Sequence, residues 1–151
     1  MADLNRYIDR PYARFELHSG DFLEIRYQPE IYVDVIIAQE LLQTCVEIAG
    51  ELAPLPVLVS LGNMRGITND ARMYLAQSDI QRQLCARVAL VYESRIGRML
   101  VNLFIHLQRP NVPTRAFSDR QRAIDWLLQP GQRARASRHF RVQVEPFEDS
   151  R

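Results

Sequence analysis

The sequence predicts one α/β domain, built on a mixed, mostly parallel five-stranded sheet that about four helices flank and whose first strand is antiparallel. Three observations predict this fold class. Near the start of the chain, two segments of alternating apolar and polar residues flank a glycine turn. Two Val- and Leu-rich segments without alternation lie in the middle of the chain. Helical patterns separate these strand-like segments from one another and from the last one. A chain of 151 residues has the length of one domain.

Two alternating segments, residues 12–18 and 22–27, predict the first pair of strands. Apolar and polar residues take turns in "YARFELH" and in "FLEIRY", and "SGD" between them supplies the glycine of a tight turn. We expect these strands to be antiparallel. Glu16 and Glu24 are then expected to face solvent from neighbouring strands.

A helix and two buried strands are predicted next. Residues 34–49 place apolar side chains at three- and four-residue spacing, with Asp34 as the candidate N-cap and Gly50 at the end. Residues 55–61 and 86–93, "LPVLVSL" and "ARVALVYE", lack alternation, which is typical of strands covered on both faces. We expect both in the middle of a parallel sheet.

Helices are also predicted between and after these strands. Thr68 is the candidate N-cap of a helix over residues 69–77, which "SDIQRQL" continues as a second short helix or an irregular turn. Residues 95–108 are predicted to be helical. "PTRAFS" predicts the last strand, and Ser118 with Gln121 matches a capping box at the start of the helix "DRQRAIDWLLQ".

These elements place the domain at residues 12–130. Residues 1–11 are expected to be an N-terminal extension, and residues 131–151 a tail that is basic and then acidic. Within the tail, "HFRVQV" alternates and predicts an added edge strand, with a disordered tail as the alternative.

Composition argues against several kinds of partner. With 19 basic and 18 acidic residues the formal net charge is +1, which predicts no bulk attraction to nucleic acid or to a membrane surface. No apolar run approaches the roughly 20 residues of a membrane span. Cys45 and Cys85 are expected to be buried thiols, and with no secretory signal in view they favour the cytoplasm.

Catalytic chemistry finds little support in the sequence. The three histidines, His18, His106 and His139, have neither metal-ligand spacing nor an adjoining nucleophile motif. We therefore expect no catalytic residue, no metal and no cofactor.

Three segments, "FELHSGDFLEIRYQPEIYVD", "PLPVLVSLGNMRGITNDARMYLA" and "VALVYESRIGRMLVNLFIHLQRPNVPTRAFSDRQRAIDWL", resemble the small bacterial STAS-like, SpoIIAA-like domains of unknown function, over residues 15–128. The resemblance implies a sheet of four or five strands flanked by helices, no catalytic activity and a role in protein contacts. The function it favours is a noncatalytic protein-interaction or regulatory module.

The resemblance also raises the question of a phosphorylation switch. In anti-sigma-factor antagonists, the better-known STAS relatives, the corresponding loop carries a phosphorylated Ser or Thr, typically in an Asp-Ser pair. Here "SLGNMRGITND" has no such pair, and its hydroxyls are Ser60 and Thr68, the second of which is expected to act as a cap. Phosphorylation of Thr68 or Ser60 is the less favoured hypothesis. Gly62 and Gly66 do not fit a phosphate-binding loop and are interpreted as turn glycines.

Arginines suggest a ligand or partner crevice instead. "ESRIGRML" puts Arg95 and Arg98 in the first turn of a helix, where cations oppose the helix dipole. Arg65 is expected at the same edge of the sheet. An anionic metabolite, a lipid headgroup or a partner's acidic side chain could compensate the positive charge there, so the alternative function is a small-ligand binding domain. The structural alternative is that these arginines pair with Glu93 inside the protein or are simply exposed to solvent.

The predicted helix over residues 95–108 has an apolar arc wider than one surface contact requires. We expect its core face to consist of Ile96, Met99, Leu100, Leu103, Phe104 and Leu107. Gly97, Val101 and Ile105 form an additional apolar strip, which predicts a homodimer contact or a cover by the chain's own "PNVP" loop or tail.

Overall fold

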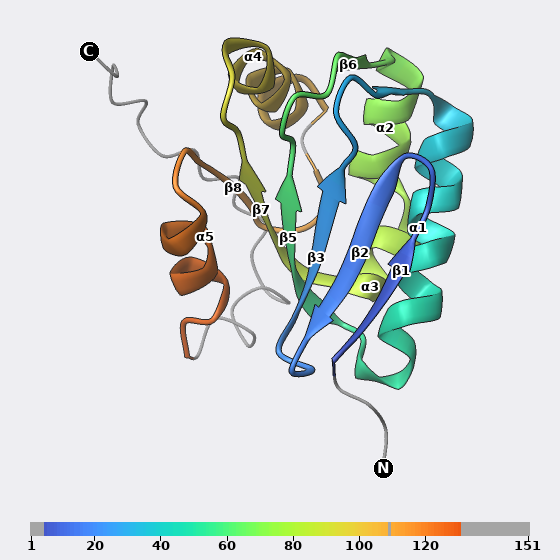
Figure 1. Ribbon diagram of the computed structural model, residues 1–151, viewed down its shortest axis with the longest axis vertical. Helices are drawn as coiled ribbons and strands as arrows, with labels where there is room; N and C mark the ends of the chain where they lie inside the picture. The colour runs from blue at the N-terminus through green and yellow to red at the C-terminus, as the bar shows by residue number, and fades with distance from the viewer. Residues whose placement is uncertain (1–4, 109, 131–151) are drawn as a thin grey trace.

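A six-stranded sheet forms the centre of the protein, for which a computed structural model describes residues 5–108 and 110–130 (Figure 1). Its strands follow the order β1-β2-β3-β5-β7-β8. The strands are β1 (Arg6–Asp9), β2 (Ala13–His18), β3 (Phe22–Tyr27), β5 (Leu55–Ser60), β7 (Cys85–Val91) and β8 (Thr114–Phe117). β1, β2 and β3 pair antiparallel, and β3, β5, β7 and β8 pair parallel, so the predicted mixed α/β class is confirmed.

The sheet has one strand more than predicted, because β1 lies inside the expected N-terminal extension. Arg6 is the register partner of Leu17, and Asp9 that of Arg14. Four residues with half of their side chains exposed give too weak an alternation to be recognised as a strand. Two further short strands, β4 (Tyr32–Val33) and β6 (Gly66–Ile67), pair parallel in a separate small sheet.

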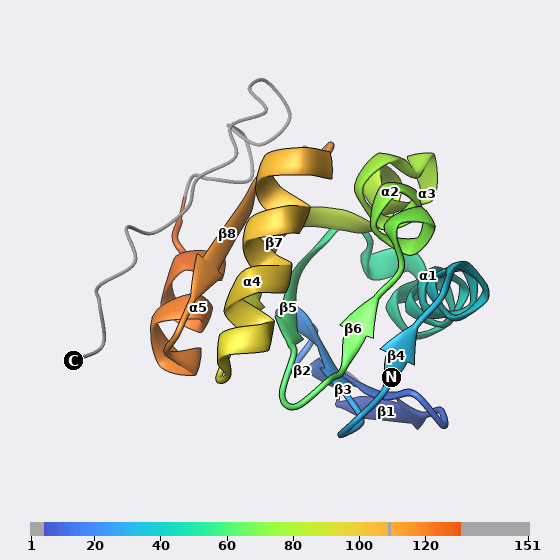
Figure 2. The same cartoon turned by 90° about the horizontal axis from the view of Figure 1, so that it is seen from above.

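Helices cover the two faces of the large sheet unequally. Figure 2 shows α1, α2 and α3 on one side of the sheet and α5 on the other. The α-helices are α1 (Val35–Ala49), α2 (Asn69–Gln77), α3 (Asp79–Leu84), α4 (Arg95–Leu103) and α5 (Arg120–Leu127). A 3-10 turn, η1 (Gly50–Leu52), follows α1, and a π-helical turn, η2 (Phe104–Gln108), continues α4.

Two of the predicted helix starts are confirmed, and a third is one residue off. Asp34 accepts a hydrogen bond of 2.8 Å from the backbone N–H of Ile37, and Thr68 accepts one of 3.1 Å from that of Ala71. The cap of α5 is Asp119 and not Ser118, because the Asp119 carboxylate accepts from two backbone N–H groups of the first turn.

The sheet separates two apolar cores. The main core lies between the sheet and the side that carries α1 to α4, and includes Phe15, Leu41 and Leu100. The second core lies under α5. Its buried members are Phe22, Leu58, Ala89, Val91, Phe117, Ala123, Trp126 and Leu127.

No helix in the described ranges is long and apolar enough to cross a membrane. The predicted tail, residues 131–151, lies outside the described residues, and so does its candidate edge strand.

Candidate functional site

The loop after β5 is a turn that contains two glycines, Gly62 and Gly66, in positions that suit a residue without a side chain. Gly62 has φ of +53°, a left-handed conformation that glycine adopts without steric cost. Gly66 lies against the ring of Tyr32, where a Cβ atom would come within 2.8 Å of Cε2. Thr68 is used as the cap of α2, and Ser60 ends β5 half-buried. Phosphorylation of either hydroxyl stays a hypothesis.

The three arginines of the expected crevice lie near the start of α4 and in the loop before β6. Arg65 and Arg95 are exposed, and Arg98 is half-buried. None of the three lines the apolar pocket or the polar hollow described below. An anion-binding crevice at these side chains therefore stays a prediction.

The strip expected at a dimer contact is buried in the protein's own core. Val101 and Ile105 are each 1% exposed, whereas Ile96 and Met99, which were expected to face the core, are 49% and 54% exposed. Gly97 is buried on the same side of the helix as Val101, and a Cβ atom there would lie 3.3 Å from Cβ of Tyr92, closer than ordinary van der Waals contact. The expected core position of Ile96 and Met99 is wrong, and of the two alternatives for the strip, burial within the chain itself is the one that agrees with the structure.

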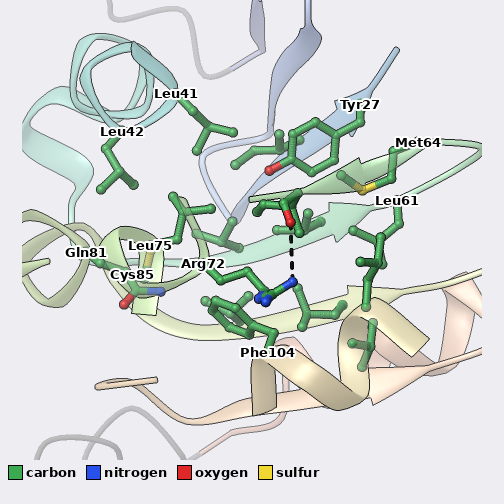
Figure 3. A pocket seen from close by; sticks show the side chains of 18 of the residues that line it. Tyr27, Leu41, Leu42, Leu61, Met64, Arg72, Leu75, Gln81, Cys85 and Phe104 are labelled. Carbon is green, nitrogen blue, oxygen red and sulfur yellow. Dashed lines mark hydrogen bonds between the residues drawn. The ribbon is translucent and has the colours of Figure 1, made fainter. Parts of the chain in front are cut away.

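The main core contains a pocket that the sequence did not indicate. Its floor is formed by β3, β5 and β7, and its walls by α1, α2, α3 and the end of α4 (Figure 3). Leu41, Val57 and Leu100 are typical of the lining. Several lining residues, Leu75 and Phe104 among them, keep some exposure, so the pocket is partly open to solvent.

The pocket is large for the interior of a small domain. The space open to the centre of a water-sized sphere is about 90 Å³, and one water molecule needs roughly 10–15 Å³ by this measure. The total empty space, with the part open to solvent, is about 760 Å³. Protein interiors are otherwise packed to the density of organic crystals, so a space of this size is a candidate binding site.

Two polar atoms on the pocket wall lack hydrogen-bond partners. Arg72 donates through Nη1 to the carbonyl of Ile67 and through Nη2 to Oδ1 of Asn69, each at 3.3 Å, but its buried Nε has no partner. Gln81 is 5% exposed, and its Oε1 also has no partner. A buried polar atom without a hydrogen bond is costly, so both atoms favour an occupant that supplies one.

Both cysteines of the chain line the same pocket as free, buried thiols. Burial raises the pKa of Cys85 to about 12. Burial and the neighbouring Cys85 raise the pKa of Cys45 well above its ordinary value. Both thiols therefore stay protonated near neutral pH and act as small apolar groups.

An ion-pair cluster occupies the opposite face of the sheet. Glu24, expected to face solvent, is 1% exposed. Its carboxylate accepts hydrogen bonds from Arg120 and Arg26, and Nε2 of His18 lies 2.8 Å from Oε1. Burial raises the pKa of Glu24, but the hydrogen bonds from Arg120, Arg26 and His18 outweigh it and lower that pKa to about 2.

This cluster has ligand atoms that a metal ion could use, but its charges oppose one. One ligand atom each from Glu16, His18 and Glu24 lies within 4.8 Å of the others. The Glu24 carboxylate already faces the guanidinium groups of Arg26 and Arg120, which would repel a cation. The adjoining polar hollow, with a volume of about 350 Å³, mixes these arginines with Glu24 and Glu93. We assign the cluster a structural role.

A family model for a domain of unknown function, DUF7793, matches residues 15–130, most of the chain and all of the elements from β3 to α5. The chain belongs to the DUF7793 family. Among proteins with curated descriptions, none matches it.

The fold of this DUF7793 chain also occurs in a solved structure. It is similar to the crystal structure of an uncharacterized protein from the DUF3478 family with a SpoIIAA-like fold, from Shewanella loihica PV-4, with a TM-score of 0.52 and 12% sequence identity. The similarity covers 84% of this chain and 98% of that chain. The SpoIIAA-like fold that the resemblance implied is thereby confirmed for the DUF7793 chain.

The features that sequence reasoning missed in this DUF7793 domain are the pocket and the Glu24 cluster. Arg72 could have indicated the pocket, because it is an arginine in the first two turns of a helix that flanks a parallel sheet. Gln81 and Glu24 offered no such signal, since a polar residue on a short surface helix or in an alternating strand is normally exposed.

Proposed function

We propose that this DUF7793 domain is a noncatalytic binding module that holds a small, mostly apolar molecule in the pocket between the sheet and helices α1 to α4. The observation that carries the proposal is the pocket itself, which is lined almost wholly by apolar side chains and is partly open to solvent. An apolar body would remove this lining from water at roughly 25 cal/mol per Å².

The two unpartnered polar atoms of the pocket support a ligand that is not pure hydrocarbon. Arg72 offers a hydrogen-bond donor and Gln81 an acceptor, both buried in the wall. A few polar groups in a largely apolar cavity are the usual composition of a small-molecule site. The proposal keeps the alternative function expected from the sequence and moves it from the Arg65, Arg95 and Arg98 edge to the pocket.

A neutral fluorescent probe tests this proposal. N-phenyl-1-naphthylamine, which has an apolar body and no charge, is expected to bind the folded wild type with an increase in fluorescence. Leu75→Trp, which fills the pocket from α2, should weaken that binding at least tenfold. Leu128→Trp is the matched control, because Leu128 is 44% exposed at the end of α5 on the other face of the sheet.

Two results would contradict the proposal. One is a folded wild type that does not bind the probe. The other is equal binding by Leu75→Trp and Leu128→Trp, with thermal melts showing that both variants are folded.

A protein-contact role, including self-association, is the second candidate, and exposed apolar side chains on α4 favour it. Ile96 and Met99 are 49% and 54% exposed on the same helix. If they form a homodimer contact, Ile96→Ser with Met99→Ser should give a folded monomer in light scattering where the wild type is a dimer. A wild type that is monomeric at high concentration removes the homodimer.

A further inference from the structure

We propose that the pocket selects an anionic ligand, a small apolar carboxylic acid whose carboxylate is held by Arg72. This inference rests on the proposed binding function and names the chemical class of its ligand. It starts from the charges of the lining. Among the described residues that line the pocket, Arg72 is the only one with a permanent charge, and none is acidic.

The position of the Arg72 guanidinium supports this inference. Figure 3 shows the side chain of Arg72 among the residues that line the pocket. Hydrogen bonds of 3.3 Å to the carbonyl of Ile67 and to Oδ1 of Asn69 hold the two terminal nitrogens. Nε is left buried and without a partner. The group is thus oriented before a ligand enters, so little order has to be created on binding.

The neighbours of Arg72 in the pocket do not neutralise its charge. Both bonds described above go to neutral oxygens, a carbonyl and an amide. The two thiols in the lining stay protonated, because burial raises the pKa of Cys45 and Cys85. Arg72 is half-buried, and no anionic group among the described residues lines the pocket beside it, so a ligand carboxylate would supply a counter-charge and an acceptor for the buried Nε.

Gln81 does not decide the charge of the ligand. A side-chain amide offers both a donor and an acceptor, so it can accept from a hydroxyl or donate to a carboxylate after turning about its last bond. The preference for an acid over a neutral molecule therefore comes from Arg72. A neutral ligand of the same length would fill the walls equally well but would leave the guanidinium without an anion.

Displacement of N-phenyl-1-naphthylamine by two matched ligands tests this inference. Decanoate and decanamide have the same chain length and nearly the same head shape, and they differ in charge at pH 7.5. Wild type is expected to bind decanoate about tenfold or more tightly than decanamide, because hydrogen bonds to charged groups are the stronger ones.

Three variants locate the preference. Arg72→Gln should bind both ligands equally, and Arg72→Lys should keep part of the preference because it keeps the charge. Arg82→Gln is the matched control, since Arg82 is an exposed arginine on α3 that pairs with Asp79 and does not line the pocket. It should bind as the wild type does.

The outcomes separate this inference from the proposed function. The inference of a carboxylic acid ligand is wrong if the probe binds but wild type does not prefer decanoate, or if Arg72→Gln keeps the preference. The proposed binding of an apolar molecule in the pocket is unaffected by either result. If the folded wild type binds neither the probe nor either decanoyl ligand, both the proposed function and the inference of a carboxylic acid ligand are wrong.

Discussion

Arg120 and Glu24, which lie 96 positions apart in the chain, are joined by two hydrogen bonds. Nη2 of Arg120 lies 2.8 Å from Oε1 of Glu24, and Nε lies 3.1 Å from Oε2. Through them the first residue of α5 is tied to the middle of β3. The carboxylate is buried while both guanidinium groups that bind it reach solvent, and the cluster joins the start of α5 to β3.

Glu24→Gln is expected to destabilise the fold by roughly 1.5–3 kcal/mol, because the amide keeps one acceptor but loses the charge that both arginines bind. Urea unfolding at pH 7 measures this change. Glu16→Gln is the control, since Glu16 is half-buried and lies 3.9 Å from both His18 and Arg26. A cost for Glu24→Gln no larger than that of the control would contradict a role for the cluster in stability.

The same pair predicts a pH dependence. The pKa of Glu24 is lowered from an ordinary 4.5 to about 2 in the folded state, so its ionised form contributes stability above pH 4.5. That contribution is lost as the pH falls from 4.5 towards 2. The stability difference between wild type and Glu24→Gln should therefore shrink across this window in urea unfolding. A difference that stays constant down to pH 2 would contradict the assignment.

Ile105→Ala is expected to cost about 2–5 kcal/mol, because Ile105 is buried in the main core and its removal leaves a cavity. Ile96→Ala, the same change at a half-exposed position of α4, should cost less than about 1 kcal/mol. Chemical denaturation of both variants measures the difference. Equal costs would contradict the difference in burial between the two side chains, and a larger cost for Ile96→Ala would mean that the helix is rotated as the sequence pattern suggested.

Thr68→Ala is expected to lower stability by about 1 kcal/mol, because the backbone N–H of Ala71 loses the oxygen that caps it. Thr68→Ser keeps that oxygen and should be nearly neutral in the same unfolding assay. Phosphate found on Thr68 in protein isolated from cells would show that the hydroxyl is not reserved for the cap.

Gly62→Ala is expected to cost about 1–2 kcal/mol, because its φ of +53° lies in the left-handed region where a Cβ atom is strained. Gly62→Asn should cost less, since asparagine visits this region more readily. Thermal melts of the two variants compare them directly. An alanine variant as stable as wild type would contradict the turn as described.

Elements whose signals are local could be predicted from the sequence. Residues 22–27 alternate because one side of β3 faces the main core, and Asp34 and Thr68 are caps whose partners lie three residues away. Features that depend on distant partners could not. Glu24 has the pattern of an exposed residue, and one of the side chains that bind its carboxylate, Arg120, lies 96 positions further along the chain.

Helix α4 shows why a periodic pattern can leave a choice open. Apolar residues lie on most of its surface, so periodicity indicates an amphipathic helix without showing which arc faces inward. In the structure the buried residues of α4 are Gly97, Leu100 and Val101, and Gly97 lies close to Tyr92. The pocket could not be predicted from the sequence for a related reason. Periodicity assigns residues to the faces of helices and strands, but whether the side chains between two faces fill the space depends on packing.

The helix α5 follows in the chain the strands with which it has most contact, β5, β7 and β8. During synthesis these strands therefore leave the ribosome before α5, the helix that covers them. Leu58, Val91 and Phe117 then form an apolar sheet face with nothing over it until Trp126 and Leu127 arrive. A nascent chain that stops before Arg120 would carry that face uncovered, so stalled synthesis at this point yields a product prone to aggregate and to bind chaperones.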